Sequence, residues 1–178
     1  YQAYVTRNGK LRRLKGKNGK NLISNFELQA VGGYASNKGI ATSGEDYDSR
    51  PVLYIENGKT VLEFSGLLRY RSAWGSIRLP PVSYRIRYLF SDKPEIRVEY
   101  GWGSRANYAP SRVPEYRFAM DTAGFPVKPE GNIWKIGPLK MVTQSEWKLN
   151  NVWRQILFPL KKKTLFNGWN QENVLFRF

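Results

Sequence analysis

Hydrophobic and polar positions alternate along much of the chain, most clearly between Ser83 and Trp102. Aromatic and aliphatic side chains occupy every second position on both sides of an Asp-Lys-Pro turn, and charged side chains lie between them. Pairing Phe90 with Ile96 sets Arg87 opposite Glu99 and keeps both faces consistent. A shift of one residue would place aromatic side chains against charges. The pattern therefore predicts an antiparallel hairpin.

A second hairpin is predicted from Pro51 to Phe64. Asn57-Gly58 is the dipeptide that best tolerates a type I′ turn, and it places an acid opposite a base beside the turn. Leu53 then lies opposite Leu62. The other face also carries apolar side chains, so we expect this hairpin to be buried on both sides.

Turn signals are dense elsewhere, and further Asn-Gly pairs occur at Asn8-Gly9, Asn18-Gly19 and Asn167-Gly168. Weaker strands are expected at Gln2–Thr6, Lys10–Leu14, Phe26–Val31, Gly66–Ala73, Glu115–Met120, Ile133–Met141, Val152–Phe158 and Asn173–Phe178. Polar or proline-containing connections are expected at Asn37–Ser49, Ser104–Val113 and Thr122–Gly131. A short helix is considered only for Ser145–Gln155.

About ten short strands between turns predict an all-β fold. We expect a single domain over residues 1–178, built as an antiparallel two-sheet β-sandwich. A closed β-barrel and a jelly roll are the alternatives.

Composition removes several kinds of chemistry. The 178 residues are 41% hydrophobic and 15% aromatic, enough for a substantial core. They include neither Cys nor His, which excludes disulfides, thiolate metal sites, Ser-His-Asp triads and the usual zinc sites. No apolar run reaches the length of a membrane helix. Position 1 is Tyr rather than Met, as expected of a processed or trimmed chain.

The formal net charge of +15 points to negatively charged partners. Anionic polysaccharide, nucleic acid and anionic lipid surfaces all suit it, and solubility or an unusual environment is the alternative explanation. The compartment stays open, with an extracellular or cell-surface location favoured.

The charge is densest near the N-terminus, in a basic run without any acid. Its members are Arg7, Lys10, Arg12, Arg13, Lys15, Lys17 and Lys20. Two Asn-Gly turns punctuate the run, which predicts a folded hairpin with a charged ridge. Such a ridge could hold phosphate, sulfate or carboxylate groups. The alternative is a solvated face with lysines that prevent edge-to-edge pairing of strands. Lys161-Lys162-Lys163 forms a second cluster.

Three tryptophans stand beside glycine, at Trp74, Trp102 and Trp169. A glycine neighbour leaves a ring face open for stacking on a sugar or a base. Trp102 is in phase with the apolar positions of its strand, which favours core packing. Trp74 and Trp169 lie near turns and are candidate ligand contacts.

Glu45, Asp46 and Asp48 form the one dense acidic patch, in a loop rich in Gly and Ser. Hard oxygen ligands at this spacing could bind calcium, although no calcium-loop motif is complete. The alternative is that these acids are solvated or cap local structure. Catalytic residues stay unknown, and the enzyme signal is weak.

Two stretches resemble galactose-mutarotase-like supersandwich domains, which occur in sugar epimerases, glycoside hydrolases and polysaccharide lyases. The first is the opening strand with Asn8-Gly9 and Leu11–Leu14, and the second is Tyr84–Phe90 with Glu95–Tyr100. They cover about a quarter of the chain. The epimerases use His, which this chain lacks. The resemblance therefore implies, at most, a lyase that uses a Tyr base with Arg or Lys beside a uronate.

Three functions follow as hypotheses. The first is a non-catalytic β-sandwich that binds anionic glycans through basic side chains and exposed Trp. The second is a nucleic-acid-binding or capsid-like sandwich, since the same side chains suit phosphates and bases. The third is an assembly subunit, an oligomer that exchanges the apolar C-terminal strand Asn173–Phe178.

Overall fold

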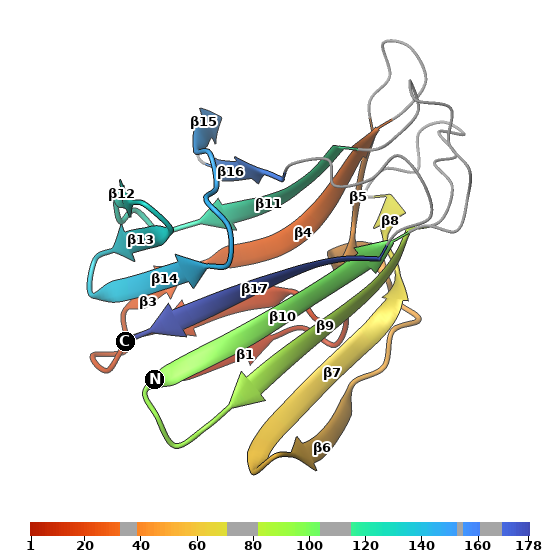
Figure 1. The fold of residues 1–178 in the computed structure, drawn as a ribbon, viewed down its shortest axis with the longest axis horizontal. Helices are drawn as coiled ribbons and strands as arrows, with labels where there is room; N and C mark the ends of the chain where they lie inside the picture. The colour runs from red at the N-terminus through yellow and green to blue at the C-terminus, as the bar shows by residue number, and fades with distance from the viewer. Residues whose placement is uncertain (33–38, 71–81, 104–114, 153–154, 161–168) are drawn as a thin grey trace.

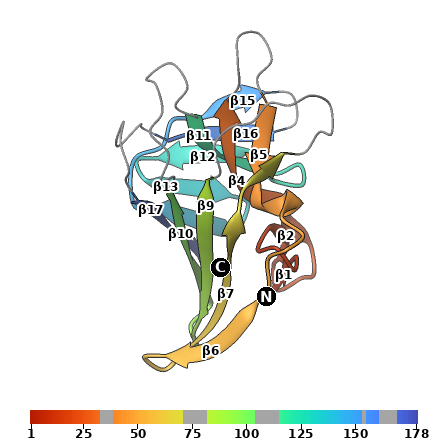
Figure 2. The same cartoon turned by 90° about the vertical axis from the view of Figure 1, so that its right-hand side faces the viewer.

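The computed structural model describes residues 1–32, 39–70, 82–103, 115–152, 155–160 and 169–178. Two antiparallel sheets pack face to face (Figures 1 and 2), which confirms the predicted two-sheet β-sandwich. The sheets are separate and do not close into a barrel. Within these ranges, no helix has the length and apolar character needed to cross a membrane.

The first sheet has nine strands in the order β1-β2-β4-β11-β16-β15, with β3 added to β2, β5 to β4 and β8 to β5. Its strands are β1 (Gln2–Val5), β2 (Leu11–Lys15), β3 (Asn21–Ile23), β4 (Asn25–Gly32), β5 (Gly39–Thr42), β8 (Arg69–Tyr70), β11 (Glu115–Asp121), β15 (Asn150–Val152) and β16 (Gln155–Pro159). A short 3₁₀ turn, η1 (Ser43–Glu45), follows β5.

The second sheet has eight strands in the order β12-β13-β14-β17-β10-β9-β7-β6. Its strands are β6 (Val52–Glu56), β7 (Lys59–Leu67), β9 (Ser83–Phe90), β10 (Glu95–Gly103), β12 (Val127–Glu130), β13 (Ile133–Ile136), β14 (Leu139–Thr143) and β17 (Trp169–Arg177).

The hairpin of β9 and β10 has the predicted register. Phe90 pairs with Ile96, and Arg87 pairs with Glu99. The two charged side chains also form an ion pair of 2.8 Å on the outer face of the sheet. Alternation alone was sufficient here because one face is buried and the other is charged.

The hairpin of β6 and β7 also has the predicted register, with Leu53 opposite Leu62. The expectation that it is buried on both sides is wrong. Leu53 is 69% exposed and Ile55 is 78% exposed. These side chains are exposed because β6 is the end strand of the second sheet and lies beyond β1 and β2 of the facing sheet (Figure 2).

Several weaker predictions need correction. Ile133–Met141 is two strands, β13 and β14, because Gly137 turns the chain with a φ of 57°. The considered helix at Ser145–Gln155 is not formed, since β15 begins at Asn150. The connection Thr122–Gly131 contains β12, and Asn37–Ser49 contains β5 and η1. Residues 37–38, 71–73, 104–113 and 153–154 of the predicted segments, and the predicted turn at Asn167-Gly168, lie outside the described residues.

The C-terminal strand is longer than predicted and lies inside its sheet. β17 pairs with β10 on one side and with β14 on the other. Val174 and Phe176 are fully buried. Exchange of this strand between copies would require it to leave two neighbours and the core.

The core between the sheets is built around stacked aromatic rings. Phe118 lies at its centre, with ring centroids 4.7 Å from Tyr100, 4.9 Å from Trp147 and 5.2 Å from Phe26. These rings come from both sheets and from the connection after β14. Aromatic contacts of this kind add to the free energy of burial. The chain ends also meet, because the rings of Tyr1 and Phe178 stack at 4.0 Å.

We expect Phe118→Ala to lower the free energy of unfolding by about 3–5 kcal/mol, since it leaves a large cavity in this cluster. Urea denaturation provides the measurement. Ile55→Ala, a truncation at an exposed position, should change the value by less than about 0.5 kcal/mol. Equal losses in the two variants would contradict the assignment of the core.

Candidate anion-binding site

The basic run does not form one ridge. Arg7 lies in the β1–β2 turn, whereas Lys17 and Lys20 flank the turn at the other end of β2. Arg12 and Arg13 are exposed along β2. The seven cations therefore lie in at least three separate parts of the structure.

Two of the cations have local structural partners. The Lys10 ammonium lies 3.0 Å from the carboxylate of Glu27, and the Lys15 ammonium lies 5.2 Å from the ring centroid of Tyr4. The first contact is an ion pair with a fully buried acid, and the second is a cation–π contact at the surface. Neither Lys10 nor Lys15 is therefore as available to a ligand as the run implies.

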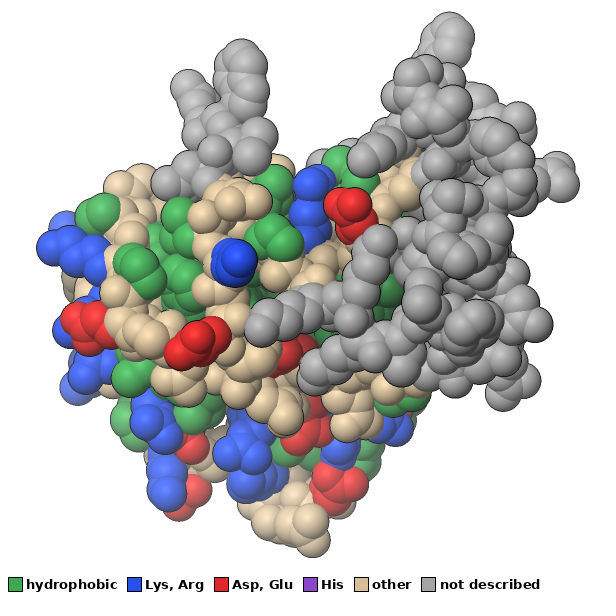
Figure 3. Space-filling view, turned by 45° about the horizontal axis from the view of Figure 1, so that its top comes forward, with side chains coloured by type: hydrophobic (Ala, Val, Ile, Leu, Met, Phe, Trp, Pro, Cys, Tyr) green, Lys and Arg blue, Asp and Glu red, His purple; other side chains and the backbone are tan. Residues whose placement is uncertain are grey.

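The face seen in Figure 3 gives the same impression of dispersed charge. Lys and Arg side chains stand apart on it, with acidic and apolar side chains between them. A broad uniform basic surface, of the kind that follows a nucleic-acid backbone, is not visible on this face.

Two members of the run line pockets. Lys17 lines one of about 180 Å³ with Tyr1, Pro138 and Phe178. Arg7 lines a larger one, which brings a second arginine beside it. This larger pocket has a volume of about 410 Å³ and is lined by Arg7, Tyr47, Ser49, Arg50 and Pro51. Two arginines, a tyrosine and a serine thus line one hollow. We refer to it below as the Arg7–Arg50 pocket.

The β1–β2 turn fixes one wall of this pocket. Gly9 has a φ of 82° and donates its N–H to the carbonyl of Thr6. The Asn8 amide donates to the carbonyl of Gly44 at 2.7 Å, which ties the turn to η1. Arg7 in turn donates to the carbonyl of Tyr47 at 2.6 Å. The guanidinium is therefore held beside the segment that forms the other wall.

Asp46 fixes that second wall. Its carboxylate is buried and accepts from the N–H of Leu67 at 3.0 Å, the hydroxyl of Tyr84 at 3.1 Å and the N–H of Asp48 at 3.2 Å. Burial raises the pKa of Tyr84, and the Asp46 carboxylate raises it further, so the phenol stays a donor. The segment carrying Tyr47 and the residues after it is thereby anchored to β7 and β9.

The three acids of the predicted metal site are directed to different partners. Asp46 accepts the three hydrogen bonds given above. Glu45 accepts from the Tyr47 hydroxyl at 3.3 Å, and the Asp48 carboxylate lies 3.5 Å from the Arg69 guanidinium. No group of three acidic side chains suited to a metal ion occurs among the residues described. The structure thus assigns Asp46 a role in anchoring the chain and does not bring Glu45, Asp46 and Asp48 together as calcium ligands.

The glycine-flanked tryptophans differ from one another. Trp102 is 4% exposed and belongs to the core, as its phase predicted. Trp169 is 47% exposed, and its indole covers Gly101 of the neighbouring strand, where no side chain could fit. It presents one ring face to solvent on the outer side of the second sheet. Trp74 and the lysines at 161–163 lie outside the described residues.

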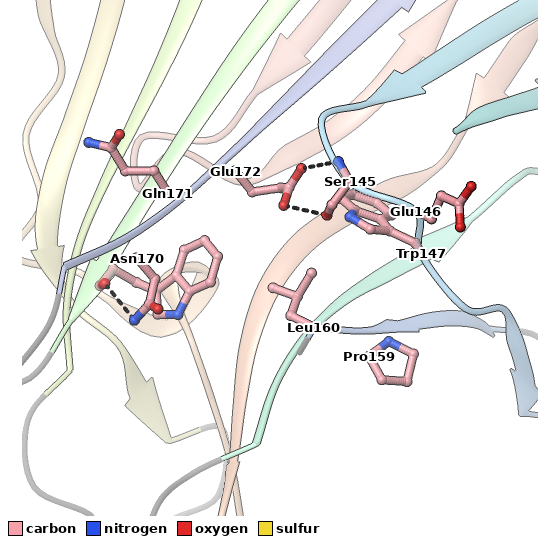
Figure 4. A pocket seen from close by; sticks show the side chains of 9 residues that line it. Ser145, Glu146, Trp147, Pro159, Leu160, Asn170, Gln171 and Glu172 are labelled. Atoms are coloured by element: carbon pink, nitrogen blue, oxygen red, sulfur yellow. Dashed lines mark hydrogen bonds between the residues drawn. The ribbon is translucent and has the colours of Figure 1, made fainter. Parts of the chain in front are cut away.

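Another pocket opens between the sheets, beside Trp102 and Trp147, with a volume of about 90 Å³. That volume corresponds to about three water molecules at ~30 Å³ each. Figure 4 shows Glu172 at its rim, accepting from the backbone N–H and the hydroxyl of Ser145. Glu172 also accepts from the N–H of Gln144. This carboxylate therefore holds the connection after β14.

Sequence reasoning found Arg7 but missed the rest of the Arg7–Arg50 pocket. Tyr47 and Arg50 lie about forty residues away along the chain, in a segment that was interpreted by its acids. The sequence signal that could have indicated this pocket is the tyrosine and the arginine that stand among those acids. Only the packed structure shows that these two residues line one pocket with Arg7.

Comparisons with known proteins add no relative. No family model matches the chain, and neither a curated protein nor a solved structure matches it. Function is therefore argued below from the geometry of the described residues.

Glu27 provides a test of the electrostatics beside the site. Burial would raise the pKa of Glu27, but Lys10, Gln29 and Thr42 together outweigh it and hold the pKa below its ordinary value of 4.5. A lowered pKa stabilises the fold above the unfolded value, and this contribution is lost as pH falls through the folded value.

We therefore expect Glu27→Gln to lower the free energy of unfolding by about 1–3 kcal/mol near neutral pH. The difference from the parent protein should shrink well below pH 4.5, where Glu27 itself becomes protonated. Urea denaturation at several pH values measures it. Glu130→Gln, which removes the acid of an exposed pair with Lys135, is the control and should have little effect. A pH-independent loss in Glu27→Gln would refute the assigned pKa direction.

Proposed function

We propose that this chain is a β-sandwich that binds anionic glycans, with the Arg7–Arg50 pocket as the subsite for a sulfate or carboxylate group. The observation that carries the proposal is that two arginines and an exposed tyrosine line one hollow. Guanidinium groups form paired hydrogen bonds with such anions. Tyr47 is 65% exposed and offers a ring on which a sugar can stack.

The distribution of charge favours a local anionic group over a long phosphate backbone. Cations at opposite ends of β2 cannot contact one compact ligand, and Lys10 is already paired. Exposed Trp169 adds a second stacking surface, on the outer side of the other sheet. These features support recognition of individual charged sugars by a pocket and separate aromatic surfaces.

Retention on immobilised heparin tests the proposal. We expect Arg7→Gln and Arg50→Gln each to elute at clearly lower salt than the parent protein, because each removes a charged donor from the pocket. Arg97→Gln is the matched control, since Arg97 is an exposed arginine on β10 of the other sheet. All three variants lose one positive charge, so a purely non-specific interaction would shift them equally.

If all three variants elute at equally reduced salt concentrations, the Arg7–Arg50 pocket is not the binding site. Single-stranded DNA, compared at matched ionic strength, separates the two ligand classes. If DNA binds the parent protein far more tightly than heparin and the Arg7 and Arg50 variants lose that binding, the nucleic-acid hypothesis replaces the glycan one.

A second candidate function is suggested by Tyr47 itself. Its hydroxyl lies 3.3 Å from Glu45 and it lines the pocket with both arginines. In a β-elimination, the phenolate form of a tyrosine takes the proton from C5 of a uronate. The C5–H electron pair forms a C4–C5 double bond, the C4–O bond breaks with its electron pair on oxygen, and that oxygen takes up a proton from water. An arginine beside the carboxylate would stabilise the charge that develops.

This activity would produce new ultraviolet absorbance on incubation with uronate polymers. We expect Tyr47→Phe to abolish the rate while heparin retention persists, because the ring and both arginines remain. No absorbance with any of several polymers would exclude lyase activity and leave the binding function.

A further inference from the structure

Among the described strands, β6 is the end strand of its sheet, and one of its edges has no partner there. It pairs with β7 alone among the strands that the structure describes. In an antiparallel pair, alternate N–H and C=O groups of an end strand point away from the sheet. Such an edge is a template for pairing with another strand.

The same strand carries an unusual share of exposed apolar surface. Of the seven exposed large hydrophobic side chains described, three lie in β6, namely Val52, Leu53 and Ile55. Leu53 and Ile55 alternate with Tyr54 and so share one face. That face continues the core side of the second sheet, because Leu53 pairs with Leu62 and Leu62 pairs with buried Tyr88.

The features that normally protect an end strand are missing within β6. Its register with β7 runs unbroken from Val52 to Glu56, so there is no bulge. The strand contains no Pro and no Lys. Natural sheets use these devices against edge-to-edge pairing, and their combined lack here marks a strand that can accept a partner.

Charge makes a second copy of this chain an acceptable partner at this edge. The hairpin of β6 and β7 contains Glu56, Glu63 and Lys59 as its charged residues, a net charge of −1 from two acids and one base. The whole chain carries +15. The hairpin thus does not share the strong positive charge of the whole chain, so little like-charge repulsion opposes the approach of two copies at this edge.

The pattern of β6 is also complementary to itself. We propose that two copies of the chain associate by antiparallel pairing of β6 with β6, centred on Tyr54. Leu53 of each copy then lies opposite Ile55 of the other, and Val52 lies opposite Glu56. The four exposed leucine and isoleucine side chains form one apolar row, and the two sheets continue into each other.

This register also has a consequence for ligand binding, which rests on the proposed function. Pro51 lines the Arg7–Arg50 pocket and directly precedes β6. The two Pro51 positions of the dimer lie about 20 Å apart, from six residues at ~3.4 Å each. One polyanion could then contact both pockets, which raises its apparent affinity.

Disulfide trapping tests the pairing, because the natural chain contains no Cys. In Tyr54→Cys, the two introduced thiols lie opposite each other within the ~4.5–5.5 Å that separates Cβ atoms of paired residues. We expect mild oxidation to yield a covalent dimer, seen on a non-reducing gel. In Val52→Cys the thiols are about 14 Å apart, from four residues at ~3.4 Å each, and should remain unlinked.

Sedimentation over a concentration series of the otherwise natural chain provides the second readout. We expect a weak dimer, since one strand pair buries less than a standard interface, and we expect Ile55→Lys to weaken it by about tenfold or more. Ser83→Lys adds the same charge at an exposed position on β9 and should leave the affinity of the dimer unchanged. Monomer at all concentrations, or equal cross-linking of the two Cys variants, would overturn the proposed pairing. Neither experiment contains a glycan, so this outcome leaves the binding proposal intact.

Discussion

The buried carboxylate of Asp46 is the interaction on which the site depends. It joins the segment after η1 to β7 through the Leu67 N–H and to β9 through the Tyr84 hydroxyl. Gly66 makes this approach possible, because any side chain there would occupy the place of the carboxylate oxygen. Loss of either contact would leave the buried carboxylate short of one donor, at a cost of about 1–3 kcal/mol. The segment is therefore held where Tyr47 and Arg50 line one pocket with Arg7.

This anchor explains how a strongly basic chain can place two of its arginines at one pocket, the proposed site. Lysines of the basic run are divided between an internal ion pair, a surface ring and a distant turn. Arg7 is brought by its turn against the anchored segment that carries Tyr47 and Arg50. Specific recognition needs donors in fixed positions, and fixed positions need a rigid neighbour.

The fold could be predicted where local pattern and burial agree. The β9–β10 register followed from alternation, because a one-residue shift would have buried charges. Alternation did not predict the exposure of β6, whose apolar residues lie beyond the facing sheet. The order of strands in a sheet cannot be deduced from local patterns of hydrophobic residues. Local pattern also did not predict the anchoring role of Asp46. That role depends on Leu67 and Tyr84, which are twenty-one and thirty-eight residues away along the chain. Such contacts depend on how the hairpins pack, which a single sequence does not reveal.

The most direct test of the account is a crystal structure of the protein with a sulfated, uronate-containing oligosaccharide. The account predicts an anionic group of the sugar within hydrogen-bond distance of both Arg7 and Arg50, with a pyranose ring against Tyr47. An oligosaccharide bound only at the β2–β3 turn beside Lys17 and Lys20, with the pocket unoccupied, would contradict it.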